Sequence, residues 1–203
     1  MRQERNAVYR EPSEAGSAEP VEDELEGARA AVDSAAAGSG IPIVDAPVPP
    51  PSGWSDPLTG ADGPHYWDRI LVNEGARIRR YKRASTVVLV EVTGLSRLAR
   101  QWGPDVAERA LVMAGRQLAR EIRPSDHIAR IDQVRFGILL PETSEIEAIN
   151  FVERARGSCE AELEFAAGVV GVSFGWASPP KGAGLIEASA LAAERLNAEL
   201  KGN

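Results

Sequence analysis

The residue types that most often do chemistry in proteins are scarce in this chain. Cysteine occurs once, as Cys159, and histidine twice, as His65 and His127. A single cysteine cannot form an internal disulfide, and two histidines without a cysteine partner give no spacing typical of zinc sites. We therefore exclude a structural zinc site and expect Cys159 to be a small, buried or half-buried side chain.

Arginine and aspartate come together in the sequence Arg123-Pro124-Ser125-Asp126. A guanidinium can hold a phosphate or a guanine edge through two hydrogen bonds, and a carboxylate can accept hydrogen bonds from guanine N–H groups. The same residues are also typical of a turn that stops a helix, with the arginine at the helix C-terminus. Both interpretations stay open. His127, which follows directly, either stacks on a base or has a structural role at the start of a strand.

The net charge of −7 lies in the first part of the chain. Residues 1–57 hold 11 acidic residues and four arginines, whereas residues 58–203 hold 19 residues of each sign. The neutral body has no global basic field, which argues against nucleic acid as a partner. One basic cluster is a solvated helix end or a contact for an acidic partner or for the acidic leader. It consists of Arg77, Arg79, Arg80, Lys82 and Arg83.

The strands that would position these residues follow from the apolar pattern. A continuous β-branched run at residues 86–92 predicts a central strand buried on both faces. Residues 127–131 and 135–140 predict two strands joined by a tight hairpin at 132–134. A further strand is predicted at about 169–176.

Helical spacing of apolar residues predicts the intervening elements. Helices are expected from Pro64 to the basic cluster, at 95–102, from Pro104 to about 123, after a cap at Thr143 or Ser144, and at 185–200. Strands alternating with helices, plus one hairpin, predict an α/β (α+β) fold with a mixed central sheet flanked by helices. The tryptophans of this region are expected to be core or interface anchors, namely Trp67, Trp102 and Trp176.

Residues 1–55 have the composition of a disordered leader. Residues 1–57 contain eight of the 14 prolines and include acidic and alanine-rich runs, and such a segment buries too little apolar surface to offset its ordering entropy. A short helix is predicted at about 22–36, and the proline-rich residues 46–51 suit a spacer or a docking segment. No apolar stretch is long enough to span a membrane, and no signal peptide is evident, so we expect a cytoplasmic protein.

Three segments, in order along residues 56–201, resemble the GGDEF domains of bacterial diguanylate cyclases. Residues 56–60 read DPLTG, similar to D-x-L-T-G. Residues 130–143 resemble the signature hairpin and its strand, and residues 172–177 resemble the V-S-x-G-x-A strand. The resemblance implies a leader at 1–55 and a GGDEF/nucleotide-cyclase-like domain at 56–203.

The resemblance also implies where that family's metal site would fall. The family condenses two GTP molecules into cyclic di-GMP, with two carboxylates holding magnesium against the triphosphate. Its metal aspartate on the first core strand corresponds to Glu91. The five signature positions fall on Asp132, Gln133, Val134, Arg135 and Phe136. Valine thus replaces the second metal carboxylate and arginine its acidic neighbour, and we predict that Glu91 and Arg135 form an ion pair instead of a metal site.

The residues that would hold GTP also differ from the family pattern. The guanine-reading residues fall on Ala99 and Glu108, the phosphate-side lysine on Ser96, and two last-helix contacts on Ala193 and Leu196. Alanine offers no hydrogen bond, which leaves polar atoms of guanine unpaired at a cost of about 1–3 kcal/mol each. We therefore predict a degenerate domain without catalytic residues, metal or cofactor.

Three functions follow from the resemblance. The first is a catalytically inactive GGDEF-like domain that acts as a signalling adaptor or regulator through contacts with an unidentified protein. The second is a cyclic di-GMP receptor, because Arg123 and Asp126 have the spacing of the family's inhibitory R-x-x-D site. The third, an active diguanylate cyclase, requires the metal site to tolerate Val134 and Arg135.

Overall fold

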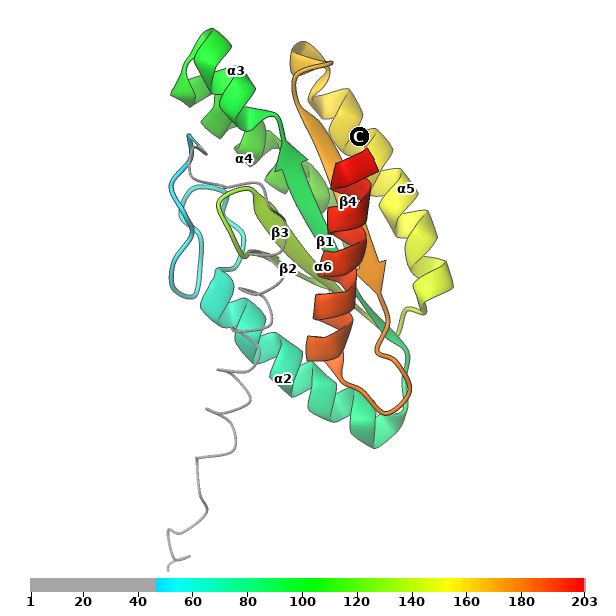
Figure 1. The fold of residues 1–203 in the computed structure, drawn as a ribbon. Coiled ribbons are helices and arrows are strands. Elements are labelled where there is room, and N and C mark those ends of the chain that lie inside the picture. Colours follow the sequence, from blue (N-terminus) through cyan, green and yellow to red (C-terminus); the bar gives the residue numbers. More distant parts are fainter. Residues whose placement is uncertain (1–46, 203) are drawn as a thin grey trace, which may run out of the picture.

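The computed structural model describes residues 47–202, whose arrangement is shown in Figure 1. The predicted order of elements is confirmed. The elements are α2 (Pro64–Tyr81), β1 (Ser85–Thr93), α3 (Leu95–Trp102), α4 (Pro104–Glu121), β2 (His127–Arg130), β3 (Arg135–Pro141), α5 (Glu145–Glu162), η1 (Glu164–Ala166), β4 (Gly171–Ala177) and α6 (Leu185–Gly202). The predicted disorder of residues 1–46 and the predicted helix at 22–36 lie outside the described residues.

The four strands form one sheet in the order β2-β3-β1-β4. All three ladders between these strands are antiparallel, and an isolated parallel bridge joins Asp62 to Ala129 beside β2. β1 lies between β3 and β4, and its first six residues are buried. This agrees with a strand covered on both faces, as the β-branched run predicts.

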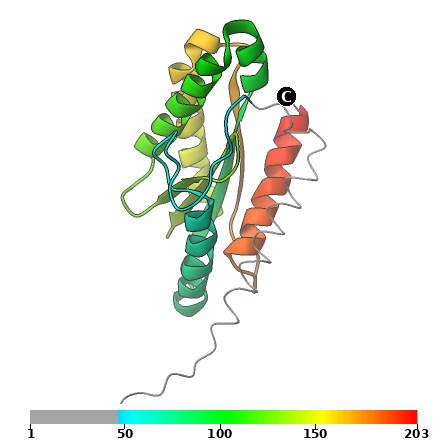
Figure 2. The ribbon, with the colours of Figure 1, turned by 90° about the vertical axis from the view of Figure 1, so that its left-hand side faces the viewer.

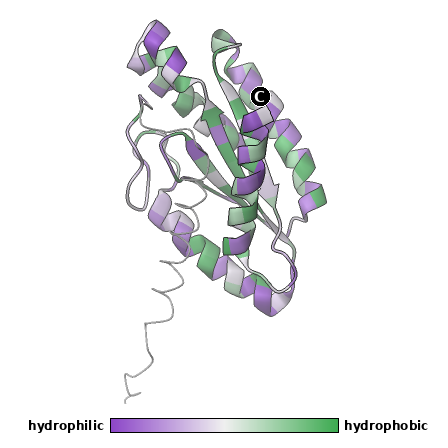
Figure 3. Ribbon diagram, in the orientation of Figure 1, coloured by the Kyte–Doolittle hydropathy of each residue, from purple (hydrophilic) through white to green (hydrophobic). Residues whose placement is uncertain are grey.

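Helices cover both faces of the sheet and bury separate apolar clusters. Alternate residues of β1 point to opposite faces: Val88 and Val90 pack with α4 and α5, whereas Val87 and Leu89 pack with α2 and α6. Figure 2 shows the sheet between α6 on one side and α4 and α5 on the other. In Figure 3, β1 is largely hydrophobic, and the helices alternate hydrophobic and hydrophilic stretches along their length.

Local sequence signals explain where the helices begin and end. α2 and α4 each have proline in the first turn, where its fixed backbone angle suits a helix start. Ser144 caps α5 in a capping box with Glu147, which selects one of the two predicted caps.

Between the sheet and α6, Gly175 lies so close to the backbone of Ala192 that a Cβ atom would overlap it.

Residues 47–55, which the composition assigns to the leader, lie against the domain. Val48 is only 2% exposed and belongs to the apolar cluster on the α4 side. The tryptophans divide: Trp67 is fully buried as predicted, Trp176 is partly buried, and Trp102 lies on the surface. Among the helices of residues 47–202, none is long and apolar enough to cross a membrane.

Candidate functional site

The signature residues form the turn between β2 and β3. The turn is held by backbone hydrogen bonds from Ile131 to Arg135 and from Arg135 to Asp132, with N···O distances of 3.0 and 3.4 Å. The carboxylate of Asp132 also accepts a hydrogen bond from the Gln133 N–H at 2.7 Å. The predicted tight hairpin is therefore confirmed, and its Gln133 side chain reaches the backbone of residue 48.

The predicted ion pair between Glu91 and Arg135 is confirmed. The two residues are direct cross-strand partners of β1 and β3, so their side chains share one face of the sheet. Arg135 Nε donates to Glu91 Oε2 at 2.6 Å, and the side chains are 7% and 15% exposed respectively. The carboxylate at the end of β1 is thus neutralised by a guanidinium from the hairpin.

The neighbouring hairpin residue is part of the apolar core. Val134 is 8% exposed and packs in the cluster that also contains Phe136 and half-buried Ala99. Its carbonyl oxygen accepts a hydrogen bond from the Val92 N–H at 2.9 Å. Apolar groups therefore occupy positions where the family resemblance implies polar ligand contacts.

A buried arginine ties the hairpin to the chain that precedes α2. Arg130 is fully buried, and its guanidinium lies 3.2 Å from the carboxylate of Asp56. It also donates to the carbonyl oxygens of Pro49 and Gln133 at 2.6 and 2.7 Å. Burial alone would raise the pKa of Asp56, but hydrogen bonds from Thr59 together with Arg130 hold it below its ordinary value.

We call residues 47–50 the strap, because this segment lies across the hairpin. Gln133 Nε2 donates to the carbonyl oxygen of Val48 at 3.3 Å, while the Val48 side chain enters the core. Sequence reasoning singled out neither Arg130 nor Val48 as a contact. The D-x-L-T-G motif marked Asp56, but nothing in the sequence paired it with an arginine 74 residues later.

Arg123 and Asp126 meet at the end of α4 and form the predicted turn. The Arg123 N–H donates to Asp126 Oδ2 at 2.8 Å, and the Asp126 N–H donates to the Arg123 carbonyl at 3.0 Å. Both residues also line a cavity of about 280 Å³ between α4, β3 and α5. The two residues thus form the turn and also border a cavity.

The cavity contains charges of both signs. Its basic residues are Arg123 and Arg154, and Arg154 donates to Glu121 Oε2 at 2.6 Å. A hydrogen bond from Ser158 and the pairing with Arg154 lower the pKa of Glu121 below its ordinary value. The other acidic lining residues are Asp126, Glu142 and Glu147. An anionic ligand would have to compete with Glu121 for Arg154.

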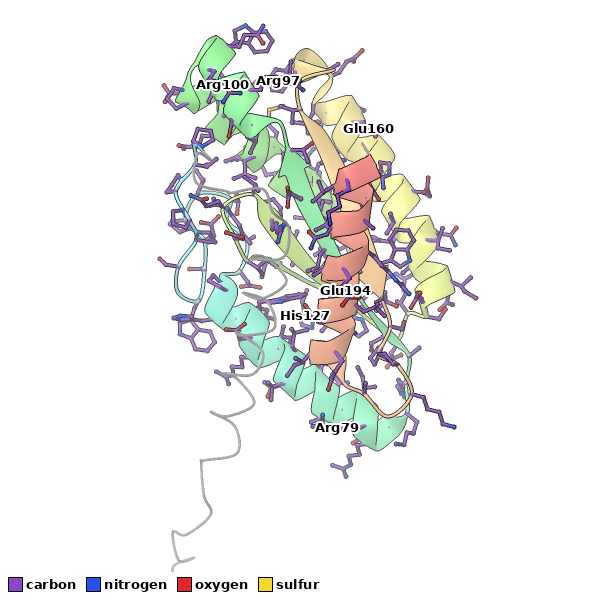
Figure 4. The ribbon with its side chains drawn as sticks, in the orientation of Figure 1. Arg79, Arg97, Arg100, His127, Glu160 and Glu194 are labelled. Carbon is purple, nitrogen blue, oxygen red and sulfur yellow. The ribbon has the colours of Figure 1, made fainter. Side chains whose placement is uncertain are left out.

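The histidine that follows the turn has a structural partner. His127 Nδ1 lies 2.8 Å from the Tyr66 hydroxyl, which favours the structural interpretation. In Figure 4, Arg79 lies on α2 near its basic end, far from the α3 residues Arg97 and Arg100. Arg97 donates to the carbonyl oxygens of Gly168 and Val169 at 3.1 and 2.9 Å.

Thiol chemistry would depend on Cys159, and metal binding on clustered His, Cys, Asp or Glu side chains. Cys159 is fully buried as predicted, and burial raises its pKa to about 12. Within residues 47–202, no three His, Cys, Asp or Glu side chains gather closely enough to hold a metal ion.

The model of the family described as diguanylate cyclase, GGDEF domain, matches residues 54–198. This match covers most of the chain, and the protein therefore belongs to the GGDEF family.

Two curated relatives from Escherichia coli K12 match part of the domain. The probable diguanylate cyclase DgcC is 30% identical over 99 residues, which are 49% of this chain and 27% of that protein. The probable diguanylate cyclase DgcT is 26% identical over 105 residues, or 52% of this chain and 23% of that protein. The aligned region thus spans about a quarter of each relative.

Solved structures share the fold at low sequence identity. The diguanylate cyclase SiaD from Pseudomonas aeruginosa, in complex with its activator SiaC, aligns with TM-score 0.66 and 21% identity over 91% of this chain and 67% of that chain. The GGDEF domain of DgcB from Caulobacter crescentus, in complex with c-di-GMP, has TM-score 0.67 and 16% identity over 75% of this chain and 92% of that chain.

Proposed function

We propose that this GGDEF domain does not synthesise cyclic di-GMP and acts as a signalling adaptor or regulator through protein contacts. The observation that carries the proposal is the ion pair between Glu91 and Arg135, with N···O 2.6 Å. It uses the carboxylate that the family resemblance assigns to magnesium.

The side chains at this position do not fit a magnesium ion. Magnesium prefers an octahedral set of oxygen ligands that usually includes carboxylates. Here Glu91 is bound to a guanidinium, and the adjacent Val134 is an apolar core residue. A cation at Glu91 would have to displace Arg135 and leave its charge buried without a partner.

The base-binding positions support the same proposal. Ala99 offers a methyl group where the family resemblance implies an asparagine, and Leu196 is buried in the core where it implies a lysine. The substitutions affect metal, base and phosphate contacts separately, so restoring one contact would leave the others absent. The strap connects this altered hairpin to the residues before the domain, which suits a domain that transmits contacts rather than turns over substrate.

Turnover of GTP tests the proposal directly. The full chain with GTP and magnesium should yield no cyclic di-GMP above the background of a protein-free control, while an active diguanylate cyclase yields product in the same assay. Isothermal titration with GTP and magnesium should show no heat of binding. Product formation that Glu91→Ala abolishes would overturn the proposal and identify an active cyclase.

A second candidate function is supported by the cavity at the end of α4. Its lining brings Arg154 of α5 together with Arg123 and Asp126 of the turn that follows α4. A phosphate and a guanine edge could be held by such guanidinium and carboxylate groups. In this alternative the domain is a receptor for cyclic di-GMP.

Titration of the full chain with cyclic di-GMP separates the two candidates. A receptor predicts saturable binding that Arg123→Ala abolishes. The matched control is Arg120→Ala, in the last turn of α4 just before the turn that holds Arg123, because Arg120 bonds to Gln117 and does not line the cavity. Absence of binding in the wild type would leave protein contact as the function, whereas equal loss in both variants would show a nonspecific charge effect.

A further inference from the structure

β4 is an edge strand of the sheet, and an exposed edge strand can pair with a strand of another chain. β4 pairs with β1 along one side, and no strand of residues 47–202 pairs with its other side. Its sequence, GVSFGWA, has no charge and no proline. An uncharged edge strand rich in apolar residues is a template for pairing with another chain.

Side chains from α5 and α6 form hydrogen bonds with backbone groups along this edge. In an antiparallel ladder, alternate residues direct their N–H and C=O groups away from the paired strand. Arg156 donates to the Val172 carbonyl at 3.1 Å, and the Phe174 N–H donates to Glu199 at 3.3 Å. Two residues further along the strand, the Trp176 carbonyl accepts a hydrogen bond from Arg195.

The fourth edge group is the N–H of Ser178, just beyond β4. It donates to Glu145 Oε2 at 2.9 Å. One backbone group at each of four alternate residues of the edge thus has a side-chain partner.

The same four side chains form two ion pairs that cross the edge from one helix layer to the other. Arg156 of α5 pairs with Glu199 of α6 at 3.0 Å, and Arg195 of α6 pairs with Glu145 of α5 at 2.6 Å. α5 and α6 pack on opposite faces of the sheet, and β4 lies between them (Figure 1). Each pair is neutral by itself, and the two pairs cross the edge with opposite polarity.

We propose that these four residues form an edge clip that closes β4 to strand addition, and that a second copy of this chain is the partner when the clip is opened. Two β4 edges can pair antiparallel about a two-fold axis, because each copy presents the same alternation of donors and acceptors. The clip therefore keeps a surface suited to self-association in a closed state.

The test replaces Arg156 and Arg195 by methionine, which removes their guanidinium groups and keeps an aliphatic side chain. Packing such as that of Arg156 over the Phe174 ring is thereby preserved. The full-length variant Arg156→Met/Arg195→Met is compared with Arg83→Met/Arg154→Met. The control loses two ion pairs away from β4, to Glu142 and Glu121, with the same change in net charge. Light scattering after size-exclusion chromatography measures mass over a range of concentrations.

We expect the clip variant to double its mass with rising concentration, while the control and the wild type do not change. Hydrogen exchange should also accelerate at the Phe174 and Ser178 amides before association. Circular dichroism confirms that each variant is folded, and Glu145→Gln/Glu199→Gln serves as a second clip variant. A folded clip variant with faster exchange at these amides but unchanged mass would overturn the proposal, as would unprotected amides in the wild type.

Discussion

At the residue scale, the pair of Glu91 and Arg135 replaces a ligand site by an internal contact. Both side chains are largely buried, and a buried charge without its partner costs more than the pair contributes. The pair therefore fixes β1 and the hairpin in one arrangement. The pair favours this arrangement mainly because separating the two buried charges is costly, and less because of their mutual attraction.

Arg135→Leu should lower the free energy of unfolding by about 3 kcal/mol, because it leaves the Glu91 carboxylate buried and unpaired. The double variant Glu91→Leu/Arg135→Leu should be more stable than Arg135→Leu alone, since it removes both charges. Urea unfolding at neutral pH measures each value. A double variant whose loss equals or exceeds the sum of the single losses would contradict this account.

Cys159 should be unreactive in the native protein. Burial raises its pKa to about 12, so the thiol is protonated at pH 8 and also shielded from reagent. A thiol-reactive dye should therefore label it in denaturant and not in buffer. Its folded pKa is the higher one, so its contribution to stability is complete below the ordinary thiol pKa and is lost as pH rises toward 12. Rapid labelling of the native protein at pH 8 would be inconsistent with this burial.

At the element scale, close approach between α6 and β4 depends on one glycine. Gly175→Ala should destabilise the domain by about 1–3 kcal/mol, because the new Cβ would overlap the backbone of Ala192. Gly157→Ala is the matched control: Gly157 is exposed on α5 with open space around it. The control should gain about 0.5–1 kcal/mol from helix propensity. Thermal unfolding compares the two, and equal effects would refute the role of close packing at Gly175.

The elements were predictable because their signals are local. The β-branched run of β1, the prolines that begin α2 and α4, and the cap at Ser144 each act within a few residues. The ion pair of Glu91 and Arg135 was predictable only because the family resemblance placed both positions together. The edge clip was not, since it needs side chains from two helices to reach the same strand edge, and periodicity does not report such contacts.

At the scale of the whole molecule, the strap makes contacts with the domain that its composition did not predict. A proline-rich segment suits a spacer, yet Pro49 accepts a hydrogen bond from Arg130, 81 residues later in the chain. Gln133 likewise reaches Val48 across 85 residues. Contacts at such separations depend on the finished fold, so residues 47–55 join the domain without any local signal.

The strap should couple the residues before the domain to the hairpin. Val48→Asp places a charge in the apolar cluster, and an unpaired buried charge is strongly unfavourable, so the strap should detach while the sheet stays folded. Its contacts with Arg130 and Gln133 would be lost, and hydrogen exchange should accelerate at residues 130–134 and at 48–56. The control, Ser52→Asp, adds the same charge at an exposed position just after the strap and should leave hydrogen exchange unchanged. Exchange that accelerates at residues 48–56 but not at 130–134 would show that the strap can detach without any effect on the hairpin, which contradicts the coupling. Acceleration in both ranges would show that a partner that displaces the strap also changes the hairpin.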